Sequence, residues 1–311
     1  YVKRQLVRYP FHICRPHRYQ GDPPGMITLY LQSCAGGIFE HDRLRQDMAA
    51  QPGARVHVTT QASTIVHRMS VGDARQETVL TAEAGALKRY AASFTNPDNK
   101  PLLGILIFDD GVAAGGLDPA ALASLPFPVT IAVDPERPDA SAVAASYHAA
   151  GAEVAILAGD LPDGSTASDV EVAYQSFTAA LPDSVALVGR PGSAMVKGGL
   201  AADHVTALLA DDGRGLVTYD AGLNDGRRAA DKAGVPNAVI EKLLSASDDN
   251  AGTVGRELDR AAFMAAQKGA SVVALPSTPE AVTSLVAWAT GPSAKSVAVA
   301  PVSAVMMAKG K

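Results

Sequence analysis

Three aspartates directly follow apolar stretches that have the composition of buried strands. Asp109 and Asp110 come after the run 103–108, and Asp220 comes after the run 216–219. Barrel enzymes built of alternating strands and helices place their catalytic groups at the carboxyl ends of the strands. We therefore take Asp109, Asp110 and Asp220 as the candidate catalytic residues.

A second group of reactive side chains lies near the start of the chain, at His12, Cys14 and His17. Thiolate and imidazole ligands suit nickel or zinc, so these residues are a candidate site for nickel or another divalent metal. Their spacing matches no structural zinc pattern. The favoured interpretation is that they are ordinary structural residues, and metal binding is the alternative.

Strands alternating with helices must position the aspartates. Asn250 is a plausible cap at the start of the clearest helix, 252–268, and Gly269 ends it. The alternation predicts an α/β domain with a parallel sheet, either closed into a barrel or open and doubly wound. The eight stretches that predict its strands are 103–108, 129–133, 154–157, 185–188, 216–219, 238–240, 272–275 and 297–300.

The first 92 residues have a different character. Two β-favouring stretches, 27–31 and 55–60, predict strands, and the small residues 84–86 are expected to open another. Residues 1–92 carry 12 basic and 7 acidic side chains, a net charge of +5, whereas the remainder carries 15 and 25, a net charge of −10. This shift predicts two domains, 1–92 and 93–311.

Composition argues against several classes of protein. The basic segment has no long Lys/Arg run and no aromatic platform, so we expect no nucleic-acid partner. No apolar stretch reaches the roughly 20 residues that a membrane-spanning helix needs, so we expect no membrane span. Cys14 and Cys34 are the only cysteines, which argues against a disulfide scaffold and predicts two free thiols.

Several short motifs follow one another in the opening segment: YPFHICRP at 9–16, GG at 36–37 with DRL at 42–44, PGAR at 52–55 and TTQAST at 59–64. In this order and spacing they resemble the urease accessory proteins of the UreD (UreH) type. The resemblance implies a scaffold that helps to load nickel into urease together with partner accessory proteins. It ends near Arg89, well short of the family's full length. His41 departs from the family's pattern, because it replaces a glycine that eases a turn.

The remainder carries LGILIFDDG at 103–111, LPFPVTIAV at 125–133, GS at 192–193, GLVTYD at 215–220 and Trp288. It resembles the divergent polysaccharide deacetylase family over nearly its whole length. The resemblance implies the fold, a distorted (β/α) barrel of the NodB type. A deacetylase of this type holds a divalent metal with an aspartate and histidines, and the metal polarises the amide carbonyl and activates water.

The histidines that such a metal needs are missing from the matching positions. Arg190 stands where the family has a histidine before Gly-Ser, so Arg190 and Ser193 are candidate substrate-binding residues. ALP at 274–276 stands where the family has Gly-His-Pro. The two histidines of this part, His148 and His204, fall in Ala-rich helical patterns and are expected to be solvated. We therefore expect no cofactor here.

Three interpretations of the aspartates stay open. The favoured one is that they are remnants that hold a strand-end turn through hydrogen bonds. In the second they line a carbohydrate-binding groove without catalysis. In the third they hold a metal such as magnesium or calcium with carboxylates alone.

The leading hypothesis for function is a non-catalytic, polysaccharide-deacetylase-like domain that binds glycan or serves structurally. The first alternative is a urease maturation factor whose opening segment contacts urease or its accessory proteins. The second is a weak carbohydrate deacetylase. An accessory factor implies the cytoplasm, and a deacetylase-like protein implies the periplasm or cell envelope.

Overall fold

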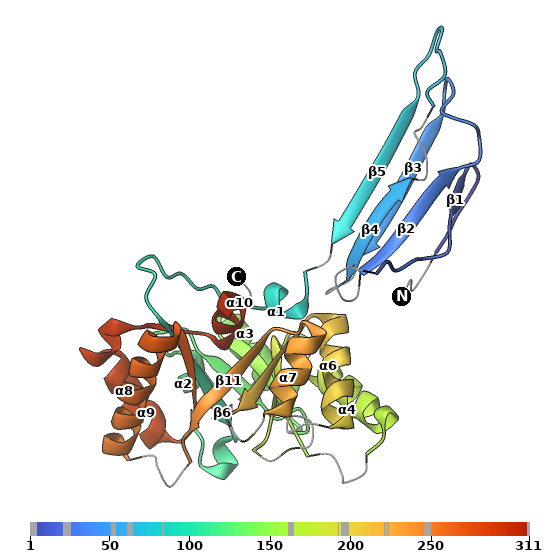
Figure 1. Cartoon of the computed structure of the whole chain (residues 1–311). Coiled ribbons are helices and arrows are strands. Elements are labelled where there is room, and N and C mark those ends of the chain that lie inside the picture. The colour runs from blue at the N-terminus through green and yellow to red at the C-terminus, as the bar shows by residue number, and fades with distance from the viewer. Residues whose placement is uncertain are drawn as a thin grey trace. The chain divides into compact units, whose positions relative to one another are not determined.

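The chain folds into two compact units, Tyr1–Glu83 and Ala84–Lys311. The computed structural model describes residues 5–20, 26–50, 54–60, 65–82, 84–160, 165–191, 193, 199–220, 222, 224–245 and 250–309. Figure 1 shows a first unit made of strands and a second unit in which helices surround a barrel. No helix among these residues is long and apolar enough to cross a bilayer.

The first unit consists of two small sheets. In one, β2 (Met26–Ser33) pairs antiparallel with β1 (Phe11–Ile13) and parallel with β4 (Arg55–Thr60). In the other, β3 (Arg43–Ala50) and β5 (Arg75–Ala82) form a parallel pair. The strands predicted at 27–31 and 55–60 are confirmed.

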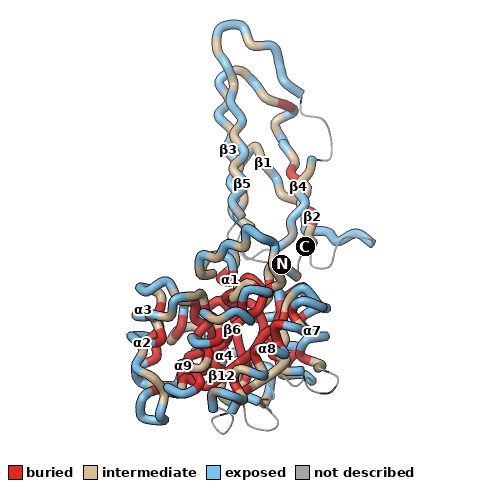
Figure 2. Tube along the Cα trace, turned by 90° about the vertical axis from the view of Figure 1, so that its left-hand side faces the viewer, coloured by how far each residue is buried: buried red, intermediate tan, exposed pale blue. Residues whose placement is uncertain are grey.

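These sheets bury little apolar surface. Before residue 84, Leu31 is the only buried hydrophobic residue in the part that the structure describes. Nine of the thirteen most exposed large hydrophobic residues described also lie there. Figure 2 shows the contrast with the buried interior of the second unit. Parallel strands are normally covered on both faces. In this unit the sheets leave apolar side chains exposed that such a covering would bury.

The second unit is a closed parallel barrel. Seven consecutive strands pair in sequence order, and the last pairs with the first over Leu102–Phe108. This closure decides between the two predicted architectures in favour of the barrel. The strands are β6 (Leu102–Asp109), β7 (Thr130–Val133), β8 (Glu153–Ala158), β9 (Ala186–Gly189), β10 (Gly215–Tyr219), β11 (Asn237–Leu243) and β12 (Ala270–Pro276).

The eighth predicted strand, β13 (Ala298–Ala300), exists but lies outside the closed ring. It pairs with Leu102–Gly104 in the first half of β6, and β7 pairs with Leu106–Asp109 in the second half. β12 spans the other edge of β6, so β13 and β7 share one edge and the ring closes without β13.

Helices cover the outside of the barrel (Figure 1). The longest, α8 (Ala251–Lys268), begins where Asn250 Oδ1 accepts a hydrogen bond from the Thr253 amide and ends at Gly269, whose φ is 85°. Both predicted ends are therefore confirmed. The other helices are α2 (Pro119–Ala123), α3 (Ala140–Ala149), α4 (Ala167–Ala180), α6 (Leu200–Asp212), α7 (Asp225–Ala233) and α9 (Pro279–Ala289), with short 3₁₀ turns at Val112–Ala114 and Ser293–Ser296.

Side chains alternate between the two sides of the barrel wall. Along β6, Ile105 and Ile107 pack with the surrounding helices, whereas Leu106 and Phe108 belong to the inner cluster. The inner cluster also contains Met306 from the last helix, α10 (Val302–Lys309). A Cβ at Gly215 would overlap the Met306 sulfur, so a larger residue there would displace the Met306 side chain.

A short helix at the start of the unit joins the same inner cluster. In α1 (Ala86–Arg89), Leu87 is 2% exposed and its amide donates to the Gly213 carbonyl at 2.9 Å. The prediction that residues 84–86 open a strand is therefore wrong. The segment forms a turn of helix instead, and this turn places the Leu87 side chain in the apolar inner cluster of the barrel.

A buried carboxylate ties this segment to α10. Glu153, at the first position of β8, is 0% exposed, and its oxygens accept hydrogen bonds from the amides of Ala92 and Ser303 and from the Thr130 hydroxyl. Burial raises the pKa of Glu153, against the opposing effect of these donors. Residues 84–92 are thus part of the barrel unit, although they precede the join expected near residue 92.

We predict that a protein comprising residues 84–311 is more stable than one comprising 93–311. The shorter protein loses buried Leu87 and the Ala92 amide bound to Glu153, and the loss of one buried leucine side chain alone costs about 2–5 kcal/mol. Urea unfolding followed by circular dichroism measures the difference. Equal midpoints and equal slopes for the two proteins would contradict the assignment of residues 84–92 to the barrel.

Candidate functional site

The candidate site lies at the carboxyl ends of the barrel strands. Asp109 ends β6 and Asp110 follows it, Asp134 follows β7, Arg190 follows β9, and Asp220 follows β10. Because all seven strands run parallel, these positions share one end of the barrel. The predicted placement of Asp109, Asp110 and Asp220 at strand ends is confirmed.

Asp109 is buried, and its carboxylate is fully engaged. Its Oδ1 accepts from the Gly111 amide at 2.9 Å, and its Oδ2 accepts from the Tyr147 hydroxyl at 2.8 Å. Arg137 Nη1 lies 3.0 Å from the same Oδ2. The residue itself is 0% exposed. The carboxylate is therefore held by three donors, as a buried charge requires.

The donors that hold Asp109 are themselves fixed. Arg137 also donates to the Asp109 carbonyl at 3.0 Å, and its other nitrogens bind both carboxylate oxygens of Asp139 at 3.0 and 2.9 Å. Tyr147 is completely buried, and burial first, then the Asp109 charge, raises the pKa of its hydroxyl. Tyr147 therefore stays neutral and donates a hydrogen bond to the carboxylate.

Gly111 makes room for this arrangement. Its φ is 82°, a left-handed conformation that favours glycine, and a Cβ at this position would lie 3.2 Å from the Arg137 guanidinium carbon. The turn after β6 thus brings the Gly111 amide onto Asp109 and leaves space for the guanidinium group.

Asp110 differs from Asp109 in its exposure. Its side chain is exposed, yet the crowded strand end desolvates the carboxyl group and raises its pKa, against the attraction of Arg190. The neighbouring charge of Asp109 adds to the increase. Asp110 is therefore the acidic group of the site that a ligand can reach.

Arg190 forms an ion pair with Asp134 at 2.8 Å, and the two side chains are 39% and 22% exposed. The amide of Ser193 donates to the Arg190 carbonyl at 2.9 Å, and Ser193 is 1% exposed. Ser193 therefore supports the turn after β9, and Arg190 presents part of its guanidinium group to solvent.

Asp220 stands apart from the other two aspartates. Its amide donates to the Ile240 carbonyl at 3.0 Å, which continues the β10–β11 pairing, and its side chain is exposed. Among the described residues we find no hydrogen bond or ion pair that joins Asp220 to Asp109, Asp110 or Arg190. The structure thus links Asp110 with Arg190 electrostatically, but it does not add Asp220 to them.

The side chains at the strand ends do not form the metal-ligand set that the sequence resemblance implies. The Asp109 carboxylate is occupied by Arg137 and Tyr147, and the Arg137 guanidinium is a fixed positive charge at that position. Within the described ranges, no three His, Cys, Asp or Glu side chains gather in a group that could hold a metal ion. We derive no step through a metal.

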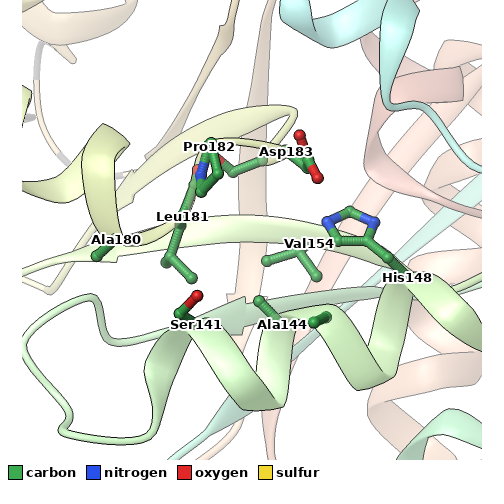
Figure 3. Close-up of a pocket in the computed structure, with 10 residues that line it drawn as sticks. Ser141, Ala144, His148, Val154, Ala180, Leu181, Pro182 and Asp183 are labelled. Atoms are coloured by element: carbon green, nitrogen blue, oxygen red, sulfur yellow. The ribbon is translucent and has the colours of Figure 1, made fainter.

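The histidines of the barrel unit lie elsewhere. His204 on α6 is exposed, as predicted. His148 on α3 is half-buried, so the prediction that it is solvated is wrong. It lines a small pocket between α3 and the segment before β9, together with Ser141, Leu181 and Asp183 (Figure 3). This segment leads into the amino end of β9. His148 therefore lies at the end of the barrel opposite to the carboxyl ends of the strands. His148 is partly covered because the segment 181–184 packs over this end of α3.

In the first unit, His12, Cys14 and His17 are not gathered into a ligand set. His12 is exposed on β1, the Cys14 amide pairs with the Tyr30 carbonyl at 3.0 Å, and His17 forms a β-bridge with Thr28. The His17 ring lies edge-on to Tyr30, with the ring centres 6.0 Å apart. These contacts are those of ordinary strand residues.

Sequence reasoning missed three residues that build the site: Asp134, Arg137 and Tyr147. Asp134 had a usable signal, because it follows an apolar strand just as Asp109 does. Arg137 and Tyr147 had none, since a turn arginine and a helical tyrosine are common and only the fold brings them to Asp109.

The closed parallel barrel, with helices around it and carboxylates at its strand ends, has the fold of the NodB-type, polysaccharide-deacetylase-like barrels. The family model described as divergent polysaccharide deacetylase matches residues 106–306, and the chain belongs to this family. The family model described as UreD urease accessory protein matches residues 1–93. The chain therefore fuses a UreD-type segment to a divergent polysaccharide deacetylase domain.

Relatives of the opening segment are close in sequence but much longer. The chain is 50% identical over 90 residues to urease accessory protein UreD 1 of Pseudomonas syringae pv. syringae, which covers 29% of this chain and 32% of that protein. It is 53% identical over 85 residues to UreD 1 of Methylorubrum populi, covering 27% and 29%. The chain thus spans about a third of the length of these curated relatives.

The barrel resembles a solved structure. An uncharacterized protein of Agrobacterium tumefaciens C58 superposes with a TM-score of 0.60 over 71% of this chain and 95% of that chain, at 14% sequence identity. At this identity the similarity concerns the fold.

We predict that Asp109 and Asp110 differ sharply in their effect on stability. Asp109→Ala leaves the Arg137 charge and the Tyr147 hydroxyl without their buried partner, so the free energy of unfolding should fall by about 3–5 kcal/mol. Asp110→Ala removes an exposed group and should change it by about 0.5 kcal/mol or less. Urea unfolding measures both, and equally small effects would contradict the structural role of Asp109.

We also predict a pH dependence that originates at His148. Burial lowers the pKa of His148 below its ordinary value of 6.5, with Asp183 opposing the shift. As the pH falls below 6.5, the unfolded chain takes up the proton more readily than the folded one, so stability decreases. His148→Gln should flatten this part of the profile of unfolding free energy against pH. The control is His204→Gln, at an exposed position on α6. An equal effect of the two variants would contradict the assignment of this pH dependence to His148.

Proposed function

We propose that the barrel is a non-catalytic member of its family that binds glycan or serves structurally. The observation that carries the proposal is the state of Asp109, the aspartate at the end of the first strand. Its carboxylate already has a guanidinium group, a phenol hydroxyl and a backbone amide as partners. A catalytic metal site needs about three protein ligands and one open position, and Asp109 has no free oxygen to give.

The positive charge of Arg190 at the end of β9 supports the same proposal. Arg190 stands where the family resemblance leads one to expect a histidine, and it keeps its positive charge beside Asp134. At about 5 Å and an effective dielectric near 20, such a charge opposes a divalent cation by about 7 kcal/mol. Solvent and the Asp134 carboxylate that pairs with Arg190 reduce this figure.

The groups left accessible suit a neutral ligand rich in hydroxyls. Asp110 is an exposed acceptor, Arg190 is a partly exposed donor, and both lie at the same end of the barrel. Sugar hydroxyls donate and accept hydrogen bonds, so they can satisfy a carboxylate and a guanidinium at once. A glycan is therefore the ligand class that we assign to this face.

The opening segment supports a second function, that of a urease maturation accessory factor. Identity of 50% over 90 residues to a urease accessory protein is the observation that favours it. In that role the segment contacts urease or its accessory proteins in the cytoplasm, and nickel is cargo rather than a resident cofactor. A glycan-binding role places the protein in the periplasm or cell envelope instead, and cell fractionation separates the two locations.

The test is an assay of acetate release from acetylated chitin oligomers in the presence of zinc, cobalt or nickel. We predict no metal-stimulated release, because Asp109 is engaged and no histidine lies at the strand ends that the structure describes. Calorimetry with the same oligomers should show weak binding that Asp110→Ala and Arg190→Ala reduce. The control is Glu171→Ala, an exposed position on α4. Metal-stimulated release that Asp110→Asn abolishes would instead establish the weak deacetylase.

A further inference from the structure

Three charged side chains at the carboxyl end of the barrel point toward the barrel axis. The last members of the inner cluster on their strands are Phe108 on β6, Ala132 on β7 and Val188 on β9. Side-chain direction repeats at every second residue of a strand. Asp110, Asp134 and Arg190, each two positions further on, therefore face the axis, whereas Asp109 faces the helices outside. We define the barrel mouth as Asp110, Asp134 and Arg190.

The ion pair between Arg190 and Asp134 crosses an intervening strand. β8 lies between β7 and β9 in the sheet, yet Arg190 Nη2 lies 2.8 Å from Asp134 Oδ2. The axis-facing position at the end of β8, two residues beyond Leu157 of the inner cluster, is Gly159. Because glycine has no side chain, this position leaves space for the pair. The ion pair therefore passes across β8 at the barrel mouth.

Glu136 adds a third carboxylate beside the barrel mouth. A Cβ at Gly159 would lie 3.3 Å from Glu136 Oε2, so this oxygen lies over the same gap in the barrel wall. The Glu136 amide also donates to Asp134 Oδ1 at 2.9 Å, which holds the two acidic residues next to each other. Three carboxylates and one guanidinium group give this place a net charge of −2.

Arg190 is the cation that these carboxylates share. Asp134 binds it directly, and burial raises the pKa of Asp110 while the Arg190 charge opposes the increase. A second guanidinium near Asp110, that of Arg137, is bound by Asp109 at 3.0 Å on the outer side of the wall. Carboxylates left without Arg190 would repel one another and attract dissolved cations.

We propose that Arg190 is a built-in cation of the barrel mouth, which holds Asp110 and Asp134 in place and keeps dissolved divalent cations away from them. The proposal deepens the non-catalytic function proposed above for the same site and rests on it. It assigns the misfit of the implied metal to a single side chain. Carboxylate oxygens suit manganese as ligands, so the barrel mouth should accept this ion once the guanidinium group is removed.

The test is a titration of the full, isotope-labelled chain with manganese(II), a paramagnetic ion that broadens the NMR signals of nearby amides. In the wild type, the amides of Asp110, Asp134 and Gly159 should broaden no more than others in the barrel. In Arg190→Gln they should broaden at a manganese concentration at least about tenfold lower, because the opposing charge is gone. The Arg190 side chain is 39% exposed, so this variant should retain the fold, and circular dichroism checks that it does.

Two control variants separate the charge of Arg190 from other effects. Arg190→Lys keeps the positive charge and should exclude manganese as the wild type does. Arg228→Gln removes an exposed arginine that pairs with Asp225 at the start of α7, and it should leave the signals of the barrel mouth unchanged. Adding Asp134→Asn to Arg190→Gln should reverse the gain in manganese binding.

The outcomes separate this proposal from the non-catalytic function. Selective broadening at the barrel mouth of the wild type would overturn the built-in cation, whether or not the variant folds. A folded Arg190→Gln that gains no manganese binding there would overturn it as well. Both results leave the non-catalytic function standing. Metal-stimulated acetate release by the wild type would overturn both proposals.

Discussion

A buried carboxylate must be neutralised where it lies, and the carboxyl end of this barrel is organised around that constraint at Asp109. One guanidinium, one phenol and one amide converge on it from the loop after β7, from α3 and from the turn after β6. The three elements are thereby held together. A site arranged in this way resists rearrangement, because removing any one partner leaves a buried polar group unsatisfied.

The opposite end of the barrel follows the same rule at Glu153. Its partners come from the segment after α1, from β7 and from the start of α10. The join between the two family matches is therefore not a simple linker, because residues on its UreD side pack in the barrel. The last residues matched by the UreD model, around Leu87 and Ala92, form part of the deacetylase-type barrel, whereas the strands before them have almost no core of their own.

The sequence predicted the strands well because parallel strands buried on both faces are continuous apolar runs, as in LLGILIFD at Leu102–Asp109. It also placed Asp109 and Asp110 at the right end of the barrel. It could not predict that Arg137 and Tyr147 meet Asp109, because such partners are chosen by three-dimensional packing. At His41 the expected glycine-type turn is present, with φ of 68° on a histidine. Leu87 shows the opposite case, where packing in the barrel end overrode a strand-like context.

The central claim is that Asp109 and Arg137 form a buried structural pair at the carboxyl end of the barrel. A double-mutant cycle with Asp109→Ala, Arg137→Ala and both together, measured by urea unfolding, tests it most directly. The account predicts that the second substitution costs much less once the first is present, with a coupling energy of about 2 kcal/mol or more. Single effects that add to within about 0.5 kcal/mol would show that the two residues act independently and would contradict the account.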